Sequence, residues 1–448
     1  MSLSTGTFTI QTKSQICCNT AKLAGNKLQK LIMIRTIFIS TCSCLLLSFS
    51  ARAQCFLDKK GNVIIDASGK PCANTVISAV PFLRITPDAR AGAMGDVGIA
   101  VSTDANAMHF NTSKLAFAEE KAGVSATYTP WLRALGLNDM YIAYLSGYTK
   151  VNDRQAVGIS ARYFSLGEIN FTDDNGTPTG TGSPNELELN GGFAQKLTNN
   201  LSVGINAKFI YSNLASGVDV GGQRAKIGYA GAADMSLSYR TEVKRAGQKL
   251  KDNFSLGLSV TNIGSKISYT NSANKDYLPA NLGLGSAYQF NIDDYNSLTF
   301  AVDVNKLMVP TPQPKVIRNT DGTTSTNPDW DNSGQAGIPD YKEFSPIGSV
   351  FKSFNDSPGG LSEELKELTY SLGMEYWYDK QFAVRAGYFN ENKLKGGRKY
   401  LTLGLGIKYN IFGLNFSYLV PTTAQRNPLD NTLRFSLLFD FGAIAAEN

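Results

Sequence analysis

Apolar and polar residues alternate along most of the chain between Gly123 and Phe441. Apolar side chains occupy every second position from Leu201 to Tyr211 and again from Leu401 to Tyr409, with serine, glycine, threonine, asparagine or lysine between them. A period of two is typical of β-strands that have one apolar and one polar face. We expect fourteen such strands, at 122–129, 139–150, 155–164, 186–196, 201–211, 225–239, 253–264, 281–290, 295–304, 367–378, 381–390, 399–409, 412–420 and 432–441.

The connections between these strands alternate between long and short. The connection at 240–252 is the exception, because it is longer and charged. This alternation is typical of an outer-membrane barrel, with tight turns inside and long loops outside. The sequence therefore predicts an all-β fold, a transmembrane antiparallel β-barrel of about 14 strands over 122–441, with an extracellular insertion at 305–366. It also predicts periplasmic termini, including a C-terminal tail at 442–448. The alternative is a soluble β-barrel or sandwich in the periplasm.

Residues 81–121 are not strand-like. Small residues and short helical pieces before the first strand predict a plug, or hatch, that enters the barrel lumen from the periplasmic end. We therefore expect residues 54–121 to form a periplasmic N-terminal segment and plug. Glycines on the non-lipid faces of the strands, such as Gly373 and Gly404, fit an interior that holds something or strands that must curve.

A secretory signal peptide is predicted at residues 33–54. Arg35 supplies the basic start, residues 37–49 the apolar run, and Ala51-Arg52-Ala53 the small-residue cleavage site. We therefore expect 1–53 to be removed as an N-terminal extension and signal peptide. Residues 1–32 are interpreted as an over-called start or a dispensable extension, with an organellar transit segment as the alternative.

Removal of this segment changes the charge and the cysteine content. It takes away six basic residues and no acidic ones, which leaves 37 lysines and arginines against 37 acidic residues. A nearly neutral mature chain lacks the clustered positive surface of a nucleic-acid-binding protein. Only Cys55 and Cys72 remain, and we expect them to close one small disulfide-bonded hairpin.

Three stretches of the chain resemble one known family. Residues 85–117, which include the run AGAMGDVG, residues 128–148 and residues 345–391 are similar to the PorV (LptO) family of the type IX secretion system, within the wider FadL-like group of outer-membrane barrels. The resemblance implies a bacterial outer-membrane carrier. Such a carrier receives cargo with C-terminal signal domains from a SprA-type translocon and delivers it to a PorU-type sortase complex.

The chain has a single histidine, His109, in the predicted plug. A Ser-His-acid hydrolase would need this residue as its base. An enzyme acting on lipid would place that base near the outer leaflet, whereas His109 belongs to the plug. We therefore interpret His109 as a packing residue and expect no enzymatic activity, with lipid deacylation as the alternative.

One acidic loop has the spacing of a Ca²⁺ site. Asp329, Asp331, Ser333 and Asp340 occupy alternating and twelfth positions around a turn at Gly334. Ala336 stands where such loops usually carry a branched apolar residue, and no paired helices flank the loop. A solvated acidic loop with no cofactor is the default interpretation, and Ca²⁺ binding is the alternative.

The predicted insertion is the best candidate for a partner-binding surface. Ile347, Val350, Phe351 and Phe354 recur at near-helical spacing, so they form either a docking face or a cap over the barrel mouth. The leading hypothesis is a non-enzymatic shuttle for type IX cargo. The shuttle itself would be surrounded by outer-membrane lipid. The rival hypothesis is a FadL-like transporter of hydrophobic small molecules, which would need a continuous apolar lumen.

Overall fold

The structure is a computed structural model. It describes residues 55–442 except 134–135, 173–175, 221–222, 248–249, 272–274, 329, 331–339 and 423–430. The predicted signal peptide and the tail beyond Gly442 lie outside the described residues.

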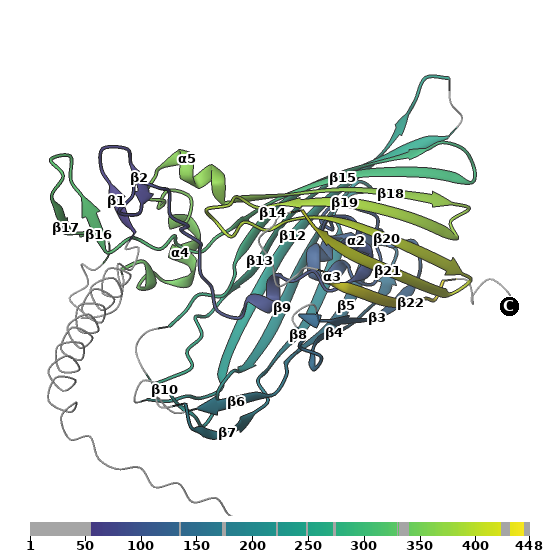
Figure 1. The fold of residues 1–448 in the computed structure, drawn as a ribbon. Coiled ribbons are helices and arrows are strands. Elements are labelled where there is room, and N and C mark those ends of the chain that lie inside the picture. Colours follow the sequence, from purple (N-terminus) through teal and green to yellow (C-terminus); the bar gives the residue numbers. More distant parts are fainter. Residues whose placement is uncertain are drawn as a thin grey trace, which may run out of the picture. The chain divides into compact units, whose positions relative to one another are not determined.

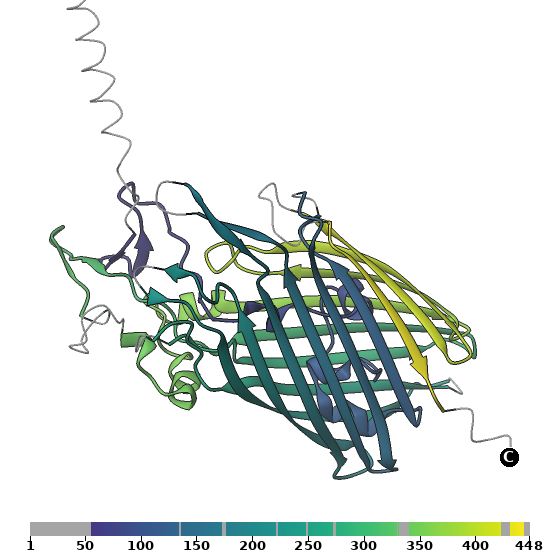
Figure 2. The same cartoon turned by 90° about the horizontal axis from the view of Figure 1, so that it is seen from below.

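Fourteen antiparallel strands close into one barrel, which confirms the predicted fold class (Figures 1 and 2). The seam that closes the barrel pairs the last strand with the first, with Phe435 opposite Tyr128. The strands are β3 (Ala122–Pro130), β4 (Met140–Asn152), β5 (Gln155–Leu166), β8 (Asn185–Lys196), β9 (Leu201–Asn213), β12 (Gly228–Lys244), β13 (Lys251–Gly264), β14 (Asn281–Asn291), β15 (Asn296–Leu307), β18 (Leu368–Tyr378), β19 (Phe382–Asn390), β20 (Lys399–Tyr409), β21 (Phe412–Pro421) and β22 (Leu433–Asp440).

The two-residue period sorts the side chains between the outside and the lumen. In β20, Leu401, Leu403 and Leu405 are about half exposed, at 48%, 55% and 47%, whereas Thr402 between them is 1% exposed. The same outward apolar face recurs on the other barrel strands. An exposed apolar belt around a closed barrel, whose backbone hydrogen bonds are all made between strands, is stable in lipid.

Connections at one end of the barrel are short. They span 153–154, 197–200, 245–250, 292–295, 379–381 and 410–411, and we call this the short-turn end. The opposite, long-connection end carries 131–139, 167–184, 214–227, 265–280, 308–367, 391–398 and 422–432. The connection expected at 240–252, which was the long exception, is reduced to 245–250. The reason is that β12 and β13 continue beyond their neighbours, with Lys244 opposite Lys251.

Several small elements lie within the long connections. The first two pairs are β6 (Ile169–Thr172) with β7 (Pro178–Gly182), and β10 (Asp219–Val220) with β11 (Gln223–Arg224). The 308–367 insertion holds β16 (Val316–Arg318), β17 (Thr324–Thr326), η4 (Asp340–Lys342), α4 (Pro346–Lys352), α5 (Leu361–Glu364) and η5 (Leu365–Glu367).

The segment before the plug lies at the long-connection end. There β1 (Phe56–Asp58) pairs with β2 (Val63–Ile65) on one side and with β16 of the insertion on the other. Cys55 and Cys72 form a disulfide that closes this hairpin. The backbone N–H of Asn74 also donates to the Leu394 carbonyl, over 2.8 Å, in another long connection. The first described residues therefore belong with the long connections.

The plug then runs through the lumen toward the short-turn end. It contains η1 (Pro81–Arg84), α2 (Ala89–Ala93), α3 (Ala107–Phe110) and η2 (Thr112–Phe117). Phe82 packs against Phe164 at the long-connection end, whereas the Ala118 carbonyl accepts a hydrogen bond from Lys150 at the short-turn end.

This course corrects two predictions. The plug enters the lumen from the long-connection end and not from the end with the tight turns. The described termini do not share one end, because Asp440 ends β22 at the short-turn end. The physical reason is the pairing of β1 with β16, 260 positions later (Leu57 opposite Ile317), which a local hydrophobic pattern does not reveal.

Wall glycines give the plug room. A Cβ on Gly387 would lie 2.0 Å from the Gly95 nitrogen, and one on Gly404 would lie 2.4 Å from the Ala93 Cβ. Both positions must therefore remain without a side chain for the plug backbone to lie against the wall.

Candidate functional site: the plugged lumen and the long-connection surface

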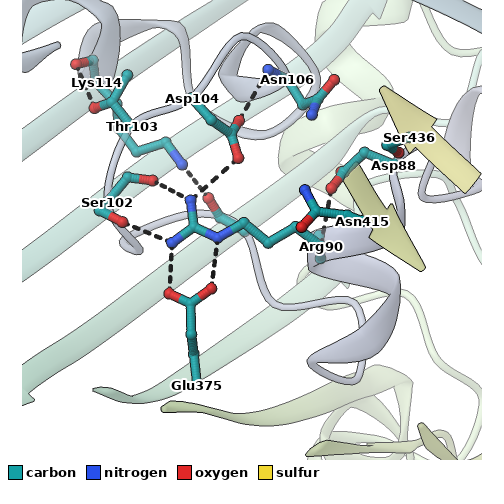
Figure 3. A network of polar contacts seen from close by, with 12 residues as sticks. Asp88, Arg90, Ser102, Thr103, Asp104, Asn106, Lys114, Glu375, Asn415 and Ser436 are labelled. Atoms are coloured by element: carbon teal, nitrogen blue, oxygen red, sulfur yellow. Dashed lines mark hydrogen bonds and ion pairs between the residues drawn. The ribbon is translucent and has the colours of Figure 1, made fainter. Parts of the chain in front are cut away.

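Arg90 holds the plug to the barrel wall. Asp88 caps the short helix α2 by accepting from the Ala91 N–H over 2.9 Å, which aims Arg90 at β18. Its guanidinium then donates twice to Glu375, over 2.9 and 2.7 Å, and once to Asp104 over 3.1 Å (Figure 3). Glu375 also accepts from Arg385 of β19 over 2.7 Å. These buried charges compensate one another, so they join the plug to two neighbouring strands.

A second charge network holds the start of the plug. Arg162 of β5 donates to the Phe82 carbonyl over 2.9 Å and pairs with Glu188 at 3.3 Å. Lys208 lies 3.5 Å from Glu188 and 2.8 Å from Asp234. The inward faces of β5, β8, β9 and β12 therefore supply a chain of paired charges to this part of the plug.

The backbone of the plug is bound by side chains of the wall. Oδ2 of Asp303 accepts from the N–H groups of Gly98 and Ile99, over 2.7 and 2.9 Å. The Gly95 N–H donates to the Thr402 hydroxyl over 2.8 Å. These backbone groups have no helix or sheet partner, so the wall satisfies them, and removal of the plug would leave them unpaired unless water entered.

Cavities remain at both ends of the plug. One of about 260 Å³ lies toward the short-turn end, beside Trp377, Arg385 and Lys408. Another of about 110 Å³ lies between the plug and the wall toward the long-connection end, beside Arg84, Lys208 and Arg398. Charged side chains contribute to the lining of both cavities, and Phe117, Trp377 and Leu438 add apolar surface to the larger one.

The insertion is fastened to the barrel by paired charges. Lys306, at the end of β15, donates to Glu364 over 2.9 Å and to Glu367 over 2.6 Å, and Lys395 donates to Glu367 over 3.0 Å. Burial alone would raise the pKa of Glu367, but the hydrogen bond from Lys306 and the charge of Lys395 outweigh burial and hold this pKa below its usual value. The end of the insertion is therefore an ordered part of the long-connection surface.

The predicted partner-binding residues lie on and beside α4. Ile347, Phe351 and Phe354 are 65%, 74% and 45% exposed, whereas Val350 is only partly exposed. Leu361 and Leu365, on α5 and η5, are also exposed, at 75% and 56%. We call Ile347, Phe351, Phe354, Leu361 and Leu365 the insertion face. Its role in binding stays a prediction.

Most of the predicted Ca²⁺ loop lies outside the described residues. Asp329, Asp331 and Ser333 lie outside them, and of Asp340 only the backbone, at the start of η4, is described. Within the part of the chain that the structure describes, no three His, Cys, Asp or Glu side chains gather as metal ligands do. Ca²⁺ binding at 329–340 stays a prediction.

His109 is engaged in packing and hydrogen bonding. Its Nδ1 lies 2.6 Å from the Arg162 guanidinium, which can only donate, so this nitrogen carries the lone pair. The ring meets Phe110 edge to face, with the ring centroids 4.5 Å apart. His109 thus helps to place the plug against β5.

Sequence reasoning missed the residues that fasten the plug. Arg162, Asp303, Glu375 and Arg385 were visible only as charges at inward positions of strands. Such charges need partners when they are buried. Arg90, the partner of Glu375, is 285 positions away from it, and no local spacing connects the two.

These features define a class of protein, an outer-membrane β-barrel whose lumen is occupied by an N-terminal plug. No helix among the described residues is long and apolar enough to cross a membrane. The family model described as "Type IX secretion system protein PorV" matches residues 69–314, more than half of the chain. The chain therefore belongs to the PorV family, which confirms the resemblance found in the sequence.

Solved structures of two toluene transporters and of a FadL homologue are also similar to this chain. The toluene transporter TbuX of Ralstonia pickettii is 14% identical, with 80% of this chain and 98% of that chain covered and a TM-score of 0.43. The toluene transporter TodX of P. putida is 11% identical, with coverages of 80% and 99% and a TM-score of 0.44. A FadL homologue of Pseudomonas aeruginosa is 11% identical, with coverages of 82% and 100% and a TM-score of 0.37. Comparison with curated proteins gives no match.

Proposed function

We propose that this protein is the outer-membrane carrier of type IX secretion. It receives cargo that bears C-terminal signal domains from a SprA-type translocon and passes this cargo to a PorU-type sortase complex at the cell surface. Membership of the PorV family is the observation that carries the proposal. The long-connection end faces the cell exterior in this arrangement, because outer-membrane barrels place their long loops outside.

The geometry supports a docking role rather than a conducting one. The plug is bound to the wall by Arg90, Asp303 and Thr402, so it occupies the lumen between the two ends of the barrel. The insertion face presents five large apolar side chains to solvent on an ordered support. Exposed apolar groups on an ordered surface are typical of protein-binding sites.

A secretion assay tests the proposal. A deletion strain should retain its type IX cargo inside the cell, and the wild-type gene should restore secretion. In the restored strain, the tagged carrier should co-purify with cargo signal domains and with the large translocon barrel. Normal secretion by the deletion strain would refute the carrier function.

The insertion face can be tested in the same strain. Phe351→Ser combined with Ile347→Ser should lower cargo co-purification while the amount of folded barrel stays the same. Leu145→Ser, on the lipid-facing side of β4, is the matched control for an exposed apolar residue. If cargo co-purifies equally with the face variant, the binding surface lies elsewhere.

The rival function, transport of hydrophobic small molecules, predicts a different result. A transporter would purify with lipid or detergent in its lumen, and its deletion would leave secretion intact while uptake of such molecules falls.

A further inference from the structure

The cavity of about 110 Å³ has the chemistry of a binding site. It lies between the plug and strands β9, β13, β14, β15, β18 and β19, and it also contacts Arg398 of the 391–398 connection. The Arg398 side chain is 27% exposed, so the cavity adjoins the surface at the long-connection end.

Arg84, at the end of η1, presents an unpaired guanidinium to this cavity. Among the described residues it makes no hydrogen bond and no ion pair. The nearby acid, Glu391, is bound through both its oxygens by Arg398, over 2.8 and 2.9 Å. Arg84 is partly exposed, shares its surroundings with a second arginine and has no anion of its own, so its donors are available to an anionic ligand.

Two carboxylates on the cavity lining have unused acceptor atoms. Asp303 binds the plug through Oδ2, and its Oδ1 has no partner. Asp96 accepts from the Tyr400 hydroxyl through Oδ2 over 2.6 Å, and its Oδ1 has no hydrogen-bond partner, with the Arg434 guanidinium 4.0 Å away. The lining thus offers one unused cationic donor together with two unused acceptors.

This combination selects among anions. Inorganic phosphate would meet Arg84 but would also bring its charge toward Asp96 and Asp303. A carboxylate joined to an N–H group uses both kinds of atom, because the carboxylate accepts from Arg84 and the N–H donates to an aspartate. The volume equals that of about four water molecules, at ~30 Å³ each, which limits the ligand to a small end group.

We propose that this cavity binds the carboxylate end of a peptide chain, with Arg84 as the carboxylate ligand and Asp303 or Asp96 as the acceptor for the last backbone N–H. This inference deepens the proposed function and rests on it, because cargo with a C-terminal signal domain presents such an end. A free amino acid carries the same groups and is the other source of this chemistry.

The experiment uses the full-length mature protein in detergent. The probe is an N-acetylated hexapeptide that copies the C-terminus of a co-purified cargo, made as the free acid and as the C-terminal amide. The free acid should bind about tenfold or more tightly than the amide, as expected for a charge-assisted pair. Arg84→Gln should reduce binding of the acid to the level of the amide, and Arg84→Lys should be intermediate. Arg133→Gln, an exposed arginine at the same end, is the matched control and should bind like the wild type.

Several outcomes would overturn the inference. They are equal binding of acid and amide, unchanged binding by a folded Arg84→Gln variant, and displacement of the acid by inorganic phosphate more effectively than by glycine. Displacement by glycine with no binding of the hexapeptide would assign the cavity to a free amino acid and would also overturn it. If cargo co-purifies but acid and amide bind alike, only this inference fails, whereas absence of cargo from the purified wild type refutes the carrier function itself.

Discussion

Arg90 of the plug and Glu375 of β18 form a buried ion pair through two parallel N–H to oxygen contacts, of 2.9 and 2.7 Å. Glu375 also binds Arg385, so a single carboxylate joins the plug to strands β18 and β19. Removal of one member of such a group costs more than the pair contributes, because the other charge is left uncompensated in the lumen. The plug is therefore held as a part of the barrel.

Arg90→Ala should lower the free energy of unfolding by about 3–5 kcal/mol, the range for breaking a buried pair. Urea unfolding in detergent, followed by the shift in electrophoretic mobility of the barrel, measures this change. The double variant Arg90→Ala/Glu375→Ala should lose less than the sum of the two single variants, because the residues are coupled. Arg154→Ala, an exposed arginine in a short turn, should unfold like the wild type. Additive effects of the two single variants would show that the pair does not hold the plug.

Gly387→Ala should destabilise the plugged barrel. Its new methyl group would lie 2.0 Å from the Gly95 nitrogen, so the plug backbone must shift, at a typical cost of about 1–3 kcal/mol. Gly191→Ala in β8 is the matched control, because a Cβ there meets no atom within 4 Å. The same unfolding assay separates the two variants, and equal stability would contradict the close contact between plug and wall.

The period of two predicted the barrel well. A lipid-facing apolar side chain at every second position is a local requirement of each strand, so Leu401, Leu403 and Leu405 identify β20 without any knowledge of its neighbours. Gly373 and Gly404 were open to two interpretations, room in the lumen or strand curvature, and both lie against the plug, at Met94 and Ala93.

The long-range pairings could not be predicted from the sequence, for a physical reason. Arg90 and Glu375, or Leu57 and Ile317, meet only after the barrel has closed and the insertion has folded, and neither partner constrains the residues beside the other. The direction of the plug depends on that second pairing, so a local pattern left it undetermined. The unpaired state of Arg84 is likewise a property of the assembled lumen alone.

The N-terminal sheet should be exposed at the cell surface. Lys60 lies in the exposed turn of this sheet, and Lys380 lies in a short turn at the other end of the barrel. Each is replaced by cysteine, in the variants Lys60→Cys and Lys380→Cys. A membrane-impermeant maleimide added to intact cells should label the first variant and spare the second, and both should react after the outer membrane is permeabilised. Cys55 and Cys72 are joined, so they contribute no background. Labelling of Lys380→Cys alone in intact cells would show that the barrel has the opposite orientation to the one that we propose.

The closure of the insertion should depend on pH through Asp356. Its Oδ2 accepts from the Thr311 N–H over 2.9 Å, which ties the two ends of the insertion together. Burial, followed by the charges of Glu364 and Glu367, raises the pKa of Asp356 to about 6 from 3.8, although the Thr311 hydrogen bond lowers it. The carboxyl of Asp356 thus binds a proton more tightly in the folded insertion than in an insertion whose ends have separated. The stability of the folded insertion should fall by about 1–2 kcal/mol, after a discount for partial exposure, as the pH rises from 3.8 through about 6.

Hydrogen exchange of residues 308–316 and 353–360 measures this effect in the full-length protein, after correction for the intrinsic pH dependence. Protection in the wild type should decrease between pH 5 and pH 7, whereas Asp356→Asn, which keeps an acceptor for Thr311 but no titrating group, should change less. Glu367 acts in the opposite direction, because its lowered pKa gives stability above 4.5 that is lost at lower pH, so both proteins should open on stronger acidification. Glu343→Gln, an exposed acid of the same insertion, should follow the wild type. The same pH slope for wild type and Asp356→Asn would remove Asp356 as the titrating group.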